Sequence, residues 1–150
     1  MIVPFPIAFL AGALVSDLIF VANANPFWAE VSKYLILAAL VMGALAAILG
    51  AIDFLSITRV REGSTGWMHM GGNVIAVLLS LFSLVHRWSD PAAGVVPVGL
   101  TISVIVTVML MVTGWLGGEL VYRHKVGVLS DAEVRSTKRA SRYRPAHPAE

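Results

Sequence analysis

The sequence predicts an all-α integral membrane protein: an antiparallel bundle of four transmembrane helices with a short, partly disordered C-terminal tail. Hydrophobic residues make up 57% of the chain and charged residues only 13%, whereas soluble domains carry about 25% charged residues. Four apolar runs have the roughly 20 residues that a helix needs to cross a bilayer. The short connections between them favour antiparallel neighbours. We expect a transmembrane domain over residues 1–128 and a basic cytoplasmic tail over residues 129–150.

The four expected spans differ in how much charge they carry. They cover residues 5–22, 34–57, 67–85 and 98–121. Asp17 is the only charge in the first span, Asp53 interrupts the second, and Glu119 is the only charge in the fourth. The third span has no Asp, Glu, Lys or Arg. Such intramembrane carboxylates need partners, and they are candidates for functional groups.

The basic residues predict the orientation of the bundle. Arg59 and Arg61 follow the second span, while only Lys33 and Arg87 flank the opposite side. Seven more basic residues follow the fourth span: Arg123, Lys125, Arg135, Lys138, Arg139, Arg142 and Arg144. Because positive charge gathers on the cytoplasmic side, both termini are expected in the cytoplasm. The tail lacks the interleaved aromatic residues of nucleic-acid sites, so its expected partner is the anionic surface of the lipid bilayer.

A polar stripe runs along the third span. Its members recur at spacings of four and three, which places them on one helical face: His69, Asn73, Ala76, Ser80, Ser83 and Arg87. The remaining positions are mostly aliphatic. We therefore expect this helix to turn the stripe inward and its aliphatic side to lipid.

Small residues predict where helices approach closely. Ala39, Gly43, Ala47 and Gly50 form a small-xxx-small pattern on the second span. Gly114 and Gly118 repeat that pattern on the fourth, and Trp115 beside them is expected to pack into the bundle. Such surfaces let another helix backbone come near.

The antiparallel arrangement brings the end of the second span, the start of the third and the end of the fourth to one end of the bundle. The candidate site residues there are Asp53, His69, Asn73, Trp115, Glu119 and His124. The first interpretation is a binding pocket on the cytoplasmic side. The alternative is a structural polar cluster in which Asp53 and Glu119 pair with His69, Arg59 or Arg123.

Two ligands suit these residues. His69 and His124 are the possible pair of iron ligands for haem b, with Asp53 or Glu119 accepting the second ring N–H of His69. His86 follows His69 by seventeen residues, about 25 Å along a helix, so it cannot share that haem. A quinone hydrogen-bonded by His69 and Glu119 is the other possibility. The absence of cysteine excludes thiolate catalysis, Cys-bound zinc and Cys-ligated iron–sulfur clusters.

Four blocks of residues carry a family resemblance. They are Phe5-Pro6-Ile7-Ala8 with Asp17, Gly50-xx-Asp53-Phe54 with Arg59, His69-xxx-Asn73, and Gly114-Trp115-Leu116-Gly117-Gly118-Glu119-Leu120-Val121-Tyr122 with His124. Over most of residues 3–128 the chain resembles the bacterial four-helix membrane family catalogued as domain of unknown function 2231. Pro4 stands where that family commonly has a histidine before Phe-Pro, so a function that needs this histidine is in question here.

The resemblance implies a cellular context for the protein but no specific activity. Relatives fused to redox domains suggest electron transfer in the bacterial inner membrane. The expected function is thus an accessory or electron-transfer-associated subunit, bound to other integral membrane subunits of a redox complex. The alternatives are a structural scaffold or docking subunit without a cofactor, and a minimal proton or ion pathway through Asp17, Asp53 and Glu119.

Overall fold

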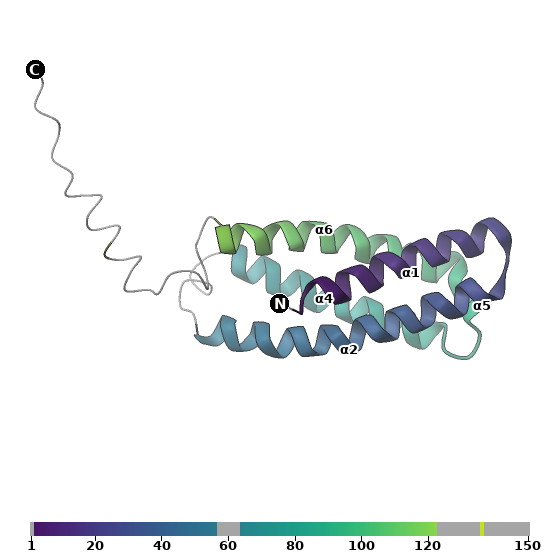
Figure 1. Cartoon of the computed structure of the whole chain (residues 1–150), viewed down its shortest axis with the longest axis horizontal. Coiled ribbons are helices and arrows are strands. Elements are labelled where there is room, and N and C mark those ends of the chain that lie inside the picture. The colour runs from purple at the N-terminus through teal and green to yellow at the C-terminus, as the bar shows by residue number, and fades with distance from the viewer. Residues whose placement is uncertain (1, 57–63, 123–135, 137–150) are drawn as a thin grey trace, which may run out of the picture.

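The computed structural model describes residues 2–56, 64–122 and 136, and the bundle it shows is helical throughout. Its long helices run antiparallel to their neighbours along the chain (Figure 1): α1 (Pro4–Asn23), α2 (Pro26–Ser56), α4 (Ser64–His86) and α6 (Leu100–Tyr122). Within these residues, four helical segments are long and apolar enough to cross a membrane. The predicted four-helix bundle is confirmed. The predicted tail lies outside the described residues, apart from Ser136.

A tight turn joins α1 to α2. Ala24 takes the left-handed conformation, with φ of 54°, and its N–H bonds to the Phe20 carbonyl at 2.7 Å. The Asn25 side chain then accepts the Phe27 N–H at 3.0 Å, which caps the start of α2. This cap starts α2 eight residues before the predicted span. Hydropathy places the apolar segment of a helix, whereas caps set where the helix begins.

A kinked connection joins α4 to α6 through a short helix α5 (Pro91–Gly94) and a wide helical turn η1 (Val95–Gly99). Asp90 caps α5 by accepting the Ala93 N–H at 3.0 Å. Val96 leaves the helical conformation, with φ of −112° and ψ of 132°. Extended backbone is what a residue before proline prefers, and Pro97 follows. The fourth helical segment therefore begins before the predicted residue 98.

The polar stripe of α4 faces the bundle, as predicted. Four of its members are at most 2% exposed: Ala76, Ser80, Ser83 and Arg87. On the other sides of the helix Leu78, Leu81 and Val85 are exposed. The core beside the stripe consists mainly of small and aliphatic residues, among them Ala13, Ile36, Ala39, Ile102 and Val106. Helices α1 and α2 form one closely packed pair, and α4 and α6 form another.

The glycine pattern on α6 was a partly wrong guide to packing. Among the described residues, a Cβ at Gly114 or Gly118 would meet no atom within 4 Å, whereas one at Gly117 would lie 2.9 Å from the His69 ring. A Cβ at Gly72 would lie 2.5 Å from Thr113 Cγ2. Helices α4 and α6 thus approach each other at Gly72 and Gly117.

The other packing predictions for small residues and for Trp115 also need correction. On α2, Ala39 is buried and Gly43 approaches Pro6, but Ala47 and Gly50 are exposed. Trp115 is 78% exposed and does not pack into the bundle. Its indole therefore lies on the outer surface of α6.

Candidate functional site

The bundle has two polar regions, one at each end of the α4 stripe. We call the end where α2 stops, α4 begins and α6 stops the His69 end, and the opposite end the Arg87 end. At the His69 end the half-buried imidazole of His69 lies against α6, with Nδ1 2.7 Å from the Thr113 carbonyl oxygen. A carbonyl can only accept, so Nδ1 carries the hydrogen. In the neutral ring Nε2 then carries the lone pair.

Asn73 stands one turn along α4 from His69. Its Nδ2 donates to the His69 carbonyl oxygen at 2.7 Å. The same Nδ2 lies 3.5 Å from Nδ1 and 3.4 Å from Nε2; because Nδ1 carries the hydrogen, only Nε2 can accept from this amide, and that contact is long. The short bond to the backbone oxygen holds the amide beside the ring and leaves Nε2 without a short partner among the described residues.

The imidazole fits against α6 because Gly117 has no side chain there. An added methyl group would lie 2.9 Å from Cε1 and 3.3 Å from Nδ1 of His69, closer than side chains normally approach. This residue, and not Gly114 or Gly118, allows the Nδ1 bond to α6. The sequence reasoning expected Asp53 or Glu119 to accept that second ring N–H. The Thr113 carbonyl accepts it instead.

Gly117→Ala is expected to push the imidazole off α6 and to destabilise the bundle by about 1 kcal/mol, at the lower end of overpacking costs. Gly118→Ala is the matched control, because its methyl group would meet nothing within 4 Å. Alanine also favours helix, so this control is expected to be neutral or stabilising. Unfolding in mixed micelles followed by circular dichroism measures both. Equal effects of the two substitutions would contradict the placement of His69 on Gly117.

The other predicted site residues are more dispersed than expected. Asp53 is exposed on the last turn of α2. Glu119 is partly buried, but it follows Gly117 by two residues, about 200° around the helix, and so projects from a different side of α6. Trp115 points outward. His124, Arg59 and Arg123 lie outside the described residues. The structure thus brings His69 and Asn73 together without placing Asp53 or Trp115 beside them.

A buried ion pair at the Arg87 end was missed by the sequence reasoning. Arg87 binds Asp17 with two contacts, Nη1 to Oδ1 at 2.8 Å and Nη2 to Oδ2 at 3.3 Å, and both side chains are 0% exposed. Ser32 accepts from Arg87 Nη1 at 2.7 Å, and Ser103 donates to Asp17 Oδ2 at 2.6 Å. The pair therefore ties together α1, α2, α6 and the residue that follows α4.

Two glycines make room for this arginine. A Cβ at Gly94 would lie 2.7 Å from Arg87 Cα, and one at Gly99 would overlap Arg87 Nη2. The predicted stripe contained the signal for this burial, because it placed Arg87 on the inward face of α4. Arg87, counted as a flanking charge for the predicted orientation, is buried and paired with Asp17. Lys33, the other residue counted on that side, pairs with Glu30 at 2.6 Å.

Within the described residues no three His, Asp or Glu side chains converge where they could hold a metal ion. The two polar arrangements at the ends of the α4 stripe are an imidazole held by a backbone carbonyl and an ion pair bonded to hydroxyl groups. A bundle of apolar helices with these two buried polar regions defines a small polytopic membrane protein.

The chain belongs to the family described as predicted membrane protein, domain of unknown function 2231, whose family profile matches residues 1–130. The suspected resemblance is thereby confirmed. Comparisons with curated proteins and with solved structures gave no match.

Proposed function

We propose that this protein is an electron-transfer-associated subunit of a bacterial inner-membrane redox complex, and that His69 binds the head group of a quinol. The observation that supports this proposal is the 2.7 Å contact between His69 Nδ1 and the Thr113 carbonyl. It fixes the ring and leaves the Nε2 lone pair as a hydrogen-bond acceptor at the start of a membrane-crossing helix.

A quinol suits this acceptor because it offers an O–H donor on a ring that dissolves in the bilayer. Nε2 would accept that hydrogen bond and so hold and orient the head group. The imidazole is only half-buried, which leaves part of it accessible to a ligand. The lipid-facing sides of α4 near this end carry exposed apolar residues, such as Met68 and Val74, which an isoprenoid-like tail can contact.

Haem b is the second candidate, because a histidine whose Nδ1–H is held by a carbonyl is a typical iron ligand through Nε2. The described residues supply one such imidazole at the His69 end. A bis-histidine site would need a second ligand, and this second proposal takes His124 for that role. An absorption spectrum separates the two candidates, because haem has a Soret band and a quinol has none.

The Arg87 end supports a scaffold role for part of the bundle rather than ion transport. Asp17 is neutralised by Arg87 and bonded to Ser103, so this carboxylate is occupied as a structural group. A pathway through Asp17, Asp53 and Glu119 gains no support from that pairing. We further propose that both termini face the cytoplasm, which would place His69 near the cytoplasmic surface.

Binding of a fluorescent or radiolabelled quinol analogue to the protein in lipid nanodiscs tests the proposal. His69→Ala is expected to weaken binding about three- to tenfold, the value of one hydrogen bond. His86→Ala is the matched control, because His86 is exposed at the Arg87 end, far from His69. Its ring stacks on that of Phe82, with the ring centroids 6.1 Å apart. Equal binding by wild type and His69→Ala would overturn the quinol proposal. A Soret band lost in His69→Ala would replace it with haem b.

The proposed setting has its own test. Purification from the native membrane in mild detergent is expected to recover subunits of a respiratory or other redox complex together with this protein. A protein that purifies alone under those conditions, with its quinol site intact, would contradict the subunit role while leaving the His69 site standing.

A further inference from the structure

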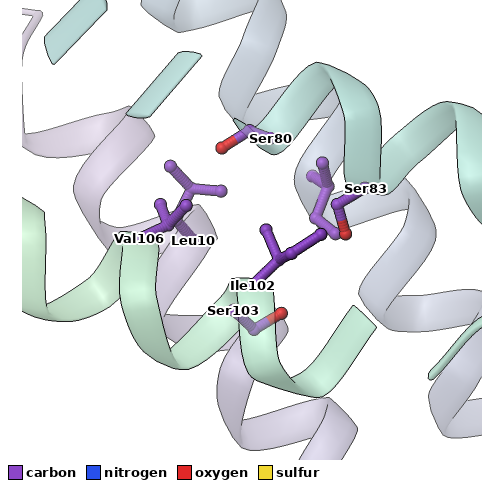
Figure 2. A pocket seen from close by; sticks show the side chains of 7 residues that line it. Leu10, Ser80, Ser83, Ile102, Ser103 and Val106 are labelled. Atoms are coloured by element: carbon purple, nitrogen blue, oxygen red, sulfur yellow. The ribbon is translucent and has the colours of Figure 1, made fainter. Parts of the chain in front are cut away.

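A small cavity lies inside the bundle, next to the Arg87 end. Figure 2 shows its lining, which comes from all four long helices: Leu10, Ile36, Ser80, Ser83, Ile102, Ser103 and Val106. The centre of a water molecule can move within about 10 Å³ of it. That is room for one water, and a buried water also needs two to four polar partners.

Three hydroxyl groups line the cavity, and one of them has no partner. Ser83 Oγ is buried and makes no hydrogen bond within the part of the chain that the structure describes. Ser80 donates to the Ala76 carbonyl at 2.8 Å, and Ser103 donates to Asp17 Oδ2 at 2.6 Å. Because each hydroxyl oxygen has two lone pairs, Ser80 and Ser103 can still accept. The cavity therefore offers one unused donor and two acceptors.

We propose that this cavity is a binding site for a single structural water molecule. The water accepts a hydrogen bond from Ser83 and donates to the hydroxyl oxygens of Ser80 and Ser103. This arrangement satisfies Ser83, which would otherwise be a buried hydroxyl without a partner, a costly state in a membrane-embedded bundle.

The bound water extends the network of the Arg87 end into the bundle. A continuous chain then runs from the Arg87 guanidinium through Asp17 and Ser103 to the water and on to Ser83 and Ser80. Beyond Ser80 the core returns to apolar side chains, with Ala76 and Val106 both 2% exposed. The water thus extends a network that joins α1, α4 and α6, and it is independent of any ligand at His69.

The first test detects the water in the wild-type protein. Nuclear Overhauser effects between water and the Ser80 and Ser83 side-chain protons are expected in detergent or nanodiscs. Their sign is expected to be that of a water molecule that stays bound for longer than the waters at the protein surface. Wild-type spectra without such contacts would overturn the proposal.

The second test uses the sign of a stability change. If the cavity holds water, Ser83→Ala removes a satisfied hydroxyl, and the unfolding equilibrium constant is expected to rise about two- to tenfold. If the cavity is dry, the same change removes an unsatisfied hydroxyl and stabilises the protein. Ser16→Ala is the matched control, because Ser16 is a buried serine bonded to its own helix at Gly12, away from the cavity.

The proposed water is supported if Ser83→Ala raises the unfolding equilibrium constant by more than Ser16→Ala does. An unchanged or more stable Ser83→Ala protein overturns it. If Ser83→Ala does not fold, the water contacts in the wild-type spectra decide the matter alone.

Discussion

Arg87→Met is expected to destabilise the bundle by about 3–5 kcal/mol, the cost of leaving one member of a buried ion pair uncompensated. Methionine keeps the length of the side chain and removes its charge. Asp17 then remains at 0% exposure with Ser103 as its one remaining partner among the described residues, and Ser32 loses its contact with the guanidinium. The low dielectric of a membrane-embedded bundle offers the carboxylate no water in compensation.

The double variant Asp17→Leu with Arg87→Met provides the control. Replacing both charges by apolar groups of similar size is often neutral or stabilising, so the double variant is expected to regain most of the lost stability. Each protein is unfolded in mixed micelles and followed by circular dichroism, and the interaction energy is taken from the double-mutant cycle. A double variant no more stable than Arg87→Met alone would show that the cost arises from lost packing rather than from the stranded charge.

The sequence was a good guide to the fold because apolar length and stripe spacing are direct physical constraints. A helix that carries His69, Ser80, Ser83 and Arg87 at spacings of three and four can bury them only on one face. The starts of α2 and of the α5 segment were harder to predict. They depend on the side-chain caps of Asn25 and Asp90, and hydropathy does not report these contacts.

The candidate site was only partly predictable. His69 and Asn73 share a helix, so their proximity follows from a spacing of four. Asp17 lies on a helix that is apolar on nearly every side, and a uniform pattern does not say which face is inward. Gly117 and Gly118 are neighbours whose directions differ by about 100°, so composition alone could not decide which one faces His69. The packing of the helices against each other determines both the inward direction of Asp17 and the contact of Gly117 with His69.

Gly99→Ala is expected to destabilise the protein by about 1–3 kcal/mol, the range for an extra carbon forced into a filled core. Its methyl group would overlap Arg87 Nη2 and the Gly94 carbonyl oxygen, and it would lie 3.0 Å from Arg87 Cζ. The guanidinium cannot move away without stretching its two contacts with Asp17. Gly71→Ala is the matched control, because a methyl group there meets nothing within 4 Å, and it is expected to be neutral or stabilising.

Combining Gly99→Ala with Arg87→Met separates a clash with the guanidinium from a general loss of packing. Methionine removes the Nη2 atom that the methyl group would overlap, so Gly99→Ala should cost less in the Arg87→Met protein than in the wild type. The same unfolding measurement gives both costs. An undiminished cost would assign the effect of Gly99→Ala to the Gly94 carbonyl instead, and Gly99 would then be needed for the turn of η1 rather than for the arginine.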